Sequence, residues 1–334
     1  MEIEVIYIAL LWFSLYGYLI VASIDFGAGM YLYFGYTTNQ HQTIATQIHN
    51  HLSPIWELSN IFFSIFFIGM LFFFPYATYH YSQVLLIPGG IALLLILYRG
   101  IFYFSGLTKR FVPVFTFIYS ASGIFIPVLL SLALTISEGG FIEKSSGDWV
   151  INWDKLPMSL YALSVVVLAI VSVLFISATF LTYYAYQAND QQSLHQLQKY
   201  SLFWGIPTIL ASLFVFFSLQ RHNSLHFEQM ISSAWMFVAS FLFFSIAMFL
   251  IFAKKYYGWA FLCVMLQYFF AFFGYGSTHL PYLLYPYITI YTNTYEQLSI
   301  EMKWIALGII VFLFLPSLYL LFRHIVKQKK KGNN

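Results

Sequence analysis

Charged residues are scarce in this sequence: only 8% of its 334 residues are Asp, Glu, Lys or Arg. An average soluble domain has about a quarter. Hydrophobic residues make up 60% of the chain, and its mean hydropathy is +0.77. This balance excludes a soluble globular protein and predicts an all-α polytopic membrane protein.

Cysteine is almost absent too. The single Cys263 lies in an apolar run, which excludes an intrachain disulfide and argues against a cysteine-based metal site. The nine histidines avoid the centres of the apolar runs, so none is placed as a buried haem ligand. His49 and His51 are two residues apart and would point in different directions on a helix. We therefore expect no metal site and no bound cofactor in this chain.

Motifs for nucleotide binding and nucleophilic catalysis are missing as well. There is no Walker sequence and no nucleophile elbow. Gly27 and Gly29 follow no strand and lack a third glycine at the spacing of a dinucleotide motif. These two glycines favour a close helix contact or a kink around Asp25 instead. We expect no catalytic residue in this chain.

Long apolar runs are what the sequence has in abundance. A transmembrane helix needs about 20 mainly apolar residues, and nine runs meet this requirement, at residues 6–27, 54–74, 84–105, 113–136, 158–186, 201–219, 232–253, 259–280 and 303–324. The residues before the first run lack the basic region of a signal peptide, so we expect this helix to be retained. The first four runs and the next four have similar lengths and separations. We therefore predict one membrane domain, 1–334, built as two four-helix bundles plus one helix.

Basic residues predict the orientation, because Lys and Arg are enriched in cytoplasmic segments. With the N-terminus outside, ten Lys and Arg residues of the loops and tail fall inside and four fall outside. Much of the net charge of +3 lies in the tail at 327–331, which is typical of a cytoplasmic anchor and not of nucleic-acid binding. We predict the N-terminus outside and the C-terminus in the cytoplasm. Segment 187–199 then forms an inner loop, and the aromatic outer segment 281–302 packs on the protein or at the membrane interface.

Three ionisable residues remain inside the apolar runs: Asp25, Glu57 and Arg99. A charge at membrane depth is costly, so such groups pair, face a wet cavity or carry an ion or proton. The predicted orientation places all three near the cytoplasmic side, although they come from three different helices. Snorkelling explains any one of them alone, but their coincidence favours a shared polar site open to the cytoplasm.

Four segments carry a resemblance to a known family. They are Ser-Ile-Asp-Phe-Gly-Ala-Gly-Met at 23–30, Leu-Ser-Pro-Ile-Trp-Glu at 52–57 with Asn60 after it, Tyr-Arg-Gly at 98–100 and Gly-Trp-Ala-Phe at 258–261. In their order and topology these segments resemble subunit II of cytochrome bd-type quinol oxidases. The resemblance covers nearly the whole chain.

The resemblance implies a multi-pass protein of the bacterial plasma membrane that forms a heterodimer with subunit I. In that family, subunit I carries two b-type haems, haem d and the loop that oxidises quinol, and subunit II ligates none of the haems. Lipids, quinone and a small single-helix accessory subunit are further partners to expect, whereas nucleic acid is not. Four electrons from quinol reduce dioxygen to water with protons from the cytoplasm, which generates a membrane potential without a pump.

The resemblance also assigns positions. The family's acidic residue in the first helix matches Asp25, and its Arg in the third helix matches Arg99. Its Trp-acid pair in the second helix matches Trp56 and Glu57. This chain departs from the family pattern in three ways: many members have Asp in place of Glu57, many have a second acid shortly after the first, and Asn60 stands one place further along than is common.

From these residues we hypothesise a proton-uptake mouth at Asp25 and Glu57, with Arg99 balancing their charge. The supporting polar and structural residues are Ser23, Gly27, Gly29, Ser53, Trp56, Ser59 and Asn60. Among them, the serines would hold waters. The alternative at this site is a structural ion pair that closes the bundle.

Two other classes of function also fit a polytopic chain with few charges. A proton-coupled secondary transporter is the main alternative, although its substrate site usually lies near the bilayer midplane, often at broken helices. A non-catalytic scaffold that only stabilises the haem subunit is the other. It differs from the first hypothesis solely in whether Asp25 and Glu57 conduct protons.

Overall fold

The computed structural model describes residues 2–37, 41–104, 113–145 and 148–292, and four single residues beyond them, 305, 308, 309 and 312. Its helices are α1 (Glu2–Thr37), α2 (His41–Phe73), α3 (Pro75–Val84), α4 (Leu86–Phe104), α5 (Pro113–Ser137), α6 (Lys155–Met158), α7 (Leu160–Gln187), α8 (Gln191–His222), α9 (Ser224–Ser232), α10 (Ala234–Phe252) and α11 (Tyr257–His279). Its strands are β1 (Ile142–Ser145), β2 (Asp148–Ile151), β3 (Tyr282–Leu284) and β4 (Ile288–Thr289). The strands form two antiparallel pairs, β1 with β2 and β3 with β4.

Eight of the predicted membrane spans coincide with helices in this part of the chain. Seven described helices are each long and apolar enough to cross a membrane; α3 and α4, which meet at an angle of 86°, make an eighth candidate when they are counted as one span. The bend falls at Leu85, between the two helices. The ninth predicted span, 303–324, lies outside the described residues apart from four single positions. The prediction of a multi-pass helical protein is therefore confirmed.

Two helices begin ten or more residues earlier than predicted. α8 begins at Gln191 rather than at 201, so most of segment 187–199 is helix and the prediction of a loop there was wrong. Asp190 caps this helix, because its carboxylate accepts a hydrogen bond from the Ser193 N–H at 3.1 Å, and the Gln and Leu residues that follow favour a helix. α2 likewise begins at His41 rather than at 54. In both cases the helix begins before the apolar run from which it was predicted.

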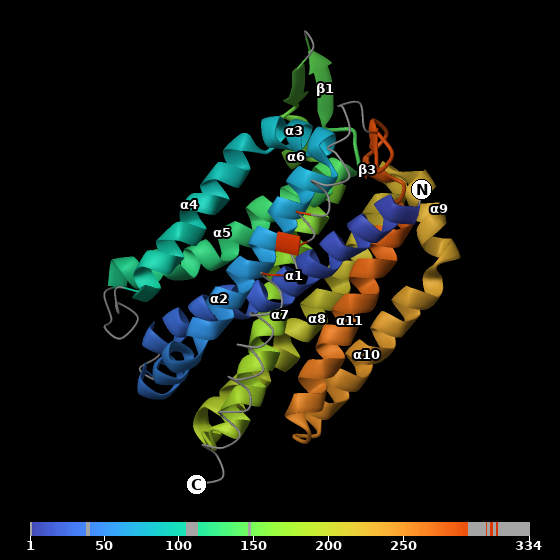
Figure 1. Cartoon of the computed structure of the whole chain (residues 1–334). Helices are drawn as coiled ribbons and strands as arrows, with labels where there is room; N and C mark the ends of the chain where they lie inside the picture. Colours follow the sequence, from blue (N-terminus) through green and yellow to red (C-terminus); the bar gives the residue numbers. More distant parts are fainter. Residues whose placement is uncertain are drawn as a thin grey trace.

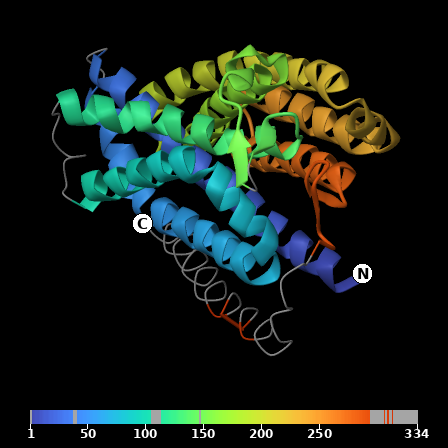
Figure 2. The same cartoon turned by 90° about the horizontal axis from the view of Figure 1, so that it is seen from above.

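α1 and α7 pack together through the middle of the molecule (Figures 1 and 2). α2, α4 and α5 lie on one side of this central pair, and α8, α10 and α11 lie on the other. The central contact is close: a Cβ atom on Gly27 would come within 2.4 Å of Ser177 Cβ. The Ser177 hydroxyl also donates to the Ile24 carbonyl oxygen at 3.0 Å. Gly27 therefore allows the two central helices to touch.

Short elements gather at one end of the bundle, where Figure 1 shows α3, α6, α9 and the hairpins close to the N-terminus. The β3–β4 hairpin buries Leu284, Ile288 and Ile290 in the same hydrophobic cluster as Leu11 of α1 and Ile136 of α5. This burial confirms that the described part of the aromatic segment, up to residue 292, packs on the protein. We call this end of the molecule the capped end.

Glycine at position 123 sets the distance between α5 and α1. A Cβ atom there would lie 2.3 Å from the Phe26 carbonyl oxygen. We predict that Gly123→Ala destabilises the protein by about 1–3 kcal/mol, because the helices have to move apart. The measurement is the midpoint of thermal denaturation of the assembled complex. Gly90→Ala is the matched control, since a Cβ atom there meets nothing within 4 Å; equal losses in the two variants would contradict this account.

Candidate functional site

Arg99 of α4 and Asp25 of α1 form a buried ion pair. Only 1% of Arg99 and 3% of Asp25 is exposed. Arg99 Nε donates to Asp25 Oδ2 at 3.0 Å, and Nη2 lies 2.9 Å from the same oxygen. Nη2 also donates to the Asp25 backbone carbonyl at 2.8 Å. Two of the three predicted intramembrane charges therefore meet.

Helix α5 supplies the remaining partners of the pair. Arg99 Nη1 donates to the Tyr119 carbonyl oxygen at 2.8 Å and to the Ser122 hydroxyl at 3.2 Å. The Tyr119 hydroxyl in turn donates to Asp25 Oδ1 at 3.1 Å, so both carboxylate oxygens accept hydrogen bonds. The Tyr119 ring also faces the guanidinium, with Arg99 Cζ 4.0 Å from the ring centroid, which is an attractive cation–π contact. The ion pair thus joins three helices.

Complete hydrogen bonding explains why these charges can be buried. A buried ion pair loses the hydration of both charges and recovers that cost only with good geometry and satisfied donors. A guanidinium has five N–H groups, and five contacts to oxygen atoms of α1 and α5 lie within 2.8–3.2 Å of Arg99. Glycine makes room for them, since a Cβ atom on Gly29 would lie 3.1 Å from the Tyr119 ring and 3.4 Å from Arg99 Nη1.

The predicted residues on α2 form a separate group beside this pair. The Trp56 indole packs on Gly100 of α4, where a Cβ atom would lie 2.8 Å from the ring. The Ser59 hydroxyl and the Asn60 amide both donate to the Trp56 carbonyl oxygen at 2.8 Å. These polar groups are therefore satisfied within α2. Of the predicted serines, Ser23 and Ser59 are buried, and the Ser53 side chain lies outside the described residues.

Glu57 is exposed and does not join the ion pair. It lies on the same face of α2 as Phe67 and Leu71, which are 49% and 56% exposed. A charge on a membrane-spanning helix is costly against lipid, so such a face is normally covered by protein or by a wet cavity. The structure therefore separates the predicted trio into a buried pair and one outward-facing acid.

The packing of α1 on α2 shows the relative depth of the two acids. The Ser14 hydroxyl donates to the Phe62 carbonyl oxygen at 2.9 Å, and the two helices are antiparallel. Counting along both helices from this contact places Glu57 about 9 Å from Asp25 along the helix axis. Tyr18 lies at a similar level to Glu57, and its buried hydroxyl has no hydrogen-bond partner among the described residues.

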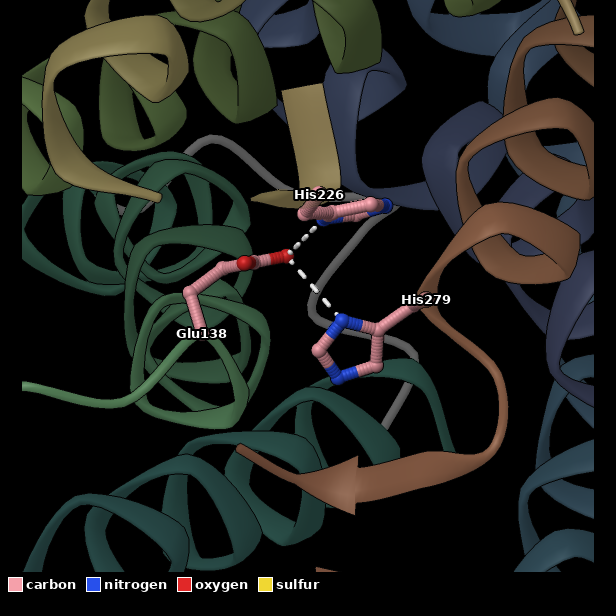
Figure 3. Close-up of side chains that lie close together, drawn as sticks. All are labelled: Glu138, His226 and His279. Atoms are coloured by element: carbon pink, nitrogen blue, oxygen red, sulfur yellow. Dashed lines mark hydrogen bonds and ion pairs between the residues drawn. The ribbon is translucent and has the colours of Figure 1, made fainter. Parts of the chain in front are cut away.

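A second buried polar cluster lies at the capped end (Figure 3). Glu138 follows α5, His226 lies in α9 and His279 ends α11. Glu138 Oε1 is 2.7 Å from His226 Nδ1 and 3.3 Å from His279 Nδ1. The Tyr275 hydroxyl also donates to Oε1, and Asn223 Nδ2 donates to Oε2 at 2.9 Å. The carboxylate is the centre of this cluster.

The turn after α5 and the start of α9 position the carboxylate. Gly139 and Gly140 have φ values of +81° and +80°, a left-handed conformation that favours glycine. A Cβ atom on Gly139 would also lie 2.4 Å from the Tyr285 carbonyl oxygen. Asn223, which binds Glu138, is the N-cap of α9 and accepts a hydrogen bond from the His226 N–H at 3.2 Å. The same side chain therefore orients both partners.

The ionisation of Glu138 follows from its surroundings. Burial by itself raises the pKa of this carboxyl group, but hydrogen bonds and positive charge from His226 and His279 outweigh it. The pKa of Glu138 is therefore held well below its usual range. The group is a carboxylate at neutral pH.

Sequence reasoning missed several of these residues. Tyr119 and Ser122 carry no signal of their own in a chain with 27 tyrosines, because only tertiary packing brings them to Arg99. For Glu138, His226 and His279 the sequence carries a weak signal. The predicted topology places all three near helix ends on the same face, and carboxylate and imidazole side chains are common metal ligands.

These observations define the class first: a multi-pass helical membrane protein in which a buried ion pair joins three helices. The family model "Cytochrome bd terminal oxidase subunit II" matches residues 3–325. A protein of Bacillus subtilis (strain 168) described as a cytochrome bd menaquinol oxidase subunit II is 30% identical over an alignment of 332 positions, which covers 97% of this chain and 95% of that protein. A solved structure of bd oxidase from Geobacillus thermodenitrificans is similar with a TM-score of 0.81 and 43% identity, over 97% of this chain and 99% of that chain.

This chain belongs to the subunit II family of cytochrome bd terminal oxidases. It is part of a quinol-oxidising complex of the bacterial plasma membrane that contains haem and more than one subunit. The predicted family and class of enzyme are therefore confirmed, and the transporter alternative is not favoured.

The buried pair makes a direct prediction for stability. Asp25→Asn keeps the shape of the side chain but leaves the Arg99 charge buried without a counter-charge. We predict a loss of about 3–5 kcal/mol in unfolding free energy, measured by chemical denaturation of the assembled complex. Asp154→Asn is the control, because Asp154 is exposed and its side chain makes no capping hydrogen bond. A variant at position 25 as stable as the wild type would show that the carboxylate does not compensate Arg99.

Proposed function

We propose that this chain is the haem-free subunit of a heterodimeric quinol oxidase. In this proposal, subunit I carries two b-type haems, haem d and the quinol site, and a small single-helix subunit accompanies the pair. The histidines of the described residues support it, since they lie toward the ends of the membrane spans and not at their centres. Menaquinol is the proposed substrate of the complex, because the Bacillus relative is described as a menaquinol oxidase subunit.

The proposed architecture has nine transmembrane helices with the N-terminus outside and the C-terminus in the cytoplasm. Two four-helix bundles, α1–α5 and α7–α11, would meet at the α1–α7 contact, and the ninth helix would lie beside them. The excess of Lys and Arg on the predicted inner side supports this orientation. In this orientation the capped end faces outward and the ion pair lies toward the cytoplasm.

The proposed contribution of this chain to the reaction is proton uptake from the cytoplasm. Glu57 would accept protons along the outer face of α2, because it is the exposed acid of the trio; it lies about 9 Å further from the cytoplasmic side than Asp25. Its face on α2 would be covered by subunit I, which removes the cost of a charge against lipid. Dioxygen reduction consumes protons, so an acid at this boundary between subunits has a clear task.

Arg99 and Tyr119 would hold Asp25, the acid of the route that lies nearer the cytoplasm, in a fixed position. Arg99 holds the Asp25 carboxylate in one position, and the Tyr119 hydroxyl is a proton donor that already contacts Asp25 Oδ1 at 3.1 Å. The buried Tyr18 hydroxyl, without a partner among the described residues, is the next proton-carrying group along α1. The observation that carries the proposal is this row of proton-carrying groups on α1 and its neighbours, beside an acid that faces outward.

The completeness of the ion pair favours a second candidate role for Asp25. All three guanidinium nitrogens and both carboxylate oxygens are already hydrogen-bonded. In this alternative, the pair only fastens α1, α4 and α5 together, and the chain stabilises the haem subunit as a scaffold. The two roles differ in whether turnover depends on the acids.

Glu57→Gln separates the two roles without disturbing the buried pair. We predict that this variant assembles with its full haem content but reduces dioxygen at least about tenfold more slowly with excess quinol, because proton transfer through Glu57 is lost. Oxygen consumption and haem spectra of the purified complex provide the measurement. Glu228→Gln is the matched control, since Glu228 is exposed in α9 at the opposite end. A Glu57→Gln complex with the turnover of the wild type would exclude Glu57 from the proton path and favour the scaffold.

A further inference from the structure

The cluster at the capped end has the composition of a metal site. One carboxylate and two imidazoles, from three separate elements, place one ligand atom each within 4.8 Å of one another. All three residues are buried. Figure 3 shows that both rings turn Nδ1 toward the same carboxylate oxygen. Such convergence of Glu and His side chains is typical of sites for zinc and related ions.

The contacts of His226 Nε2 leave Nδ1, which lies 2.7 Å from Glu138 Oε1, as the nitrogen in the position of a metal ligand. His226 Nε2 lies 3.0 Å from Thr278 Oγ1 and 3.3 Å from the Tyr275 carbonyl oxygen. The Thr278 hydroxyl donates its own proton to a backbone carbonyl of α11, so toward His226 it acts as an acceptor. Nε2 therefore carries a proton and donates it. A metal-binding histidine is usually held in this way, by a hydrogen bond from the nitrogen opposite to the metal.

Hydrogen bonds alone do not explain well why so many groups surround the Glu138 carboxylate. Three donors converge on Glu138 Oε1: His226 Nδ1, His279 Nδ1 and the Tyr275 hydroxyl. A carboxylate oxygen has about two acceptor positions. His279 Nε2 is buried and has no hydrogen-bond partner among the described residues. A cation between the carboxylate and the two Nδ1 atoms would replace the crowded donors with coordination bonds.

The spacing fits a small divalent ion. Zinc binds nitrogen and oxygen at about 2.0–2.2 Å, so neighbouring ligand atoms of a tetrahedral site are about 3.3 Å apart. His279 Nδ1 and Glu138 Oε1 have this separation, 3.3 Å, and the His226 contact at 2.7 Å has to widen by about half an ångström. Three protein ligands leave one position open, next to the Tyr275 hydroxyl.

We propose that Glu138, His226 and His279 bind a divalent transition-metal ion, with Zn²⁺ as the best fit. The ion would fasten α9 and the end of α11 to the turn after α5. Its role is structural, since it stabilises the capped end of the subunit. The proposal does not depend on the proton route, which lies on other residues.

The test measures zinc in the intact oxidase complex. Wild-type complex is saturated with Zn²⁺, passed through a desalting column, and analysed for zinc relative to its haem content. We expect about one zinc ion per complex, and loss of most of it in Glu138→Gln and His279→Gln. His195→Ala is the control for adventitious binding, because His195 is an exposed histidine of α8 outside the cluster, and this variant should keep its zinc. Wild-type complex without retained zinc, or equal zinc in all four proteins, would overturn the proposal.

A second measurement uses the wild type alone, in case the cluster variants do not assemble. Treatment with 1,10-phenanthroline should lower the midpoint of thermal denaturation, and added Zn²⁺ should restore it where added Mg²⁺ does not, because imidazole ligands favour zinc. A midpoint that is unchanged by both the chelator and Zn²⁺ would show that the cluster is a hydrogen-bonded ion pair only.

Discussion

The guanidinium of Arg99 is the buried charge that the packing of α1, α4 and α5 has to accommodate. A permanent positive charge with five N–H groups is buried among apolar helices, and it is stable there only if a counter-charge and enough acceptors surround it. Asp25 supplies the charge, and the backbone and side chains of α1 and α5 supply the acceptors. The positions of three helices relative to one another are therefore coupled to one side chain.

The close packing of the helices around Arg99 also depends on glycine. The acceptors of α1 and α5 reach Arg99 because these two helices approach closely at Gly123, and Gly27 allows α1 to pack as closely on α7. In a membrane, where apolar side chains gain little by leaving lipid, close packing and hydrogen bonds are the main forces that hold helices together. The ion pair and the glycines are thus two parts of one arrangement. At the capped end, Glu138 is likewise a buried charge, and its contacts with His226 and His279 join separate elements of the chain.

Much of the fold could be predicted from the sequence, because apolar runs of membrane length report directly on spans. The pairing of Asp25 with Arg99 was also within reach, since charges are so rare in this chain that the few buried ones have to meet.

The sequence could not predict how each helix is rotated about its own axis. Glu57 faces outward while Asp25 faces inward, and this depends on how α1 and α2 are rotated against each other. The start of α8 was missed because an apolar run marks the part of a helix that lies in the membrane and does not mark the residue at which the helix begins. The Glu138 cluster was missed because its members are far apart in sequence and come together only through the tertiary packing of α5, α9 and α11.

The most direct test of whether this ion pair serves proton transfer as well as packing is the double variant Asp25→Leu with Arg99→Met. Replacing both charges with apolar residues removes the cost of an unpaired buried charge, so the complex should assemble with its haem spectrum intact. Quinol-driven oxygen consumption is then measured together with the membrane potential in proteoliposomes. Our account predicts an assembled complex whose turnover falls at least about tenfold. Full turnover with a normal membrane potential would contradict it and would leave the pair a purely structural role.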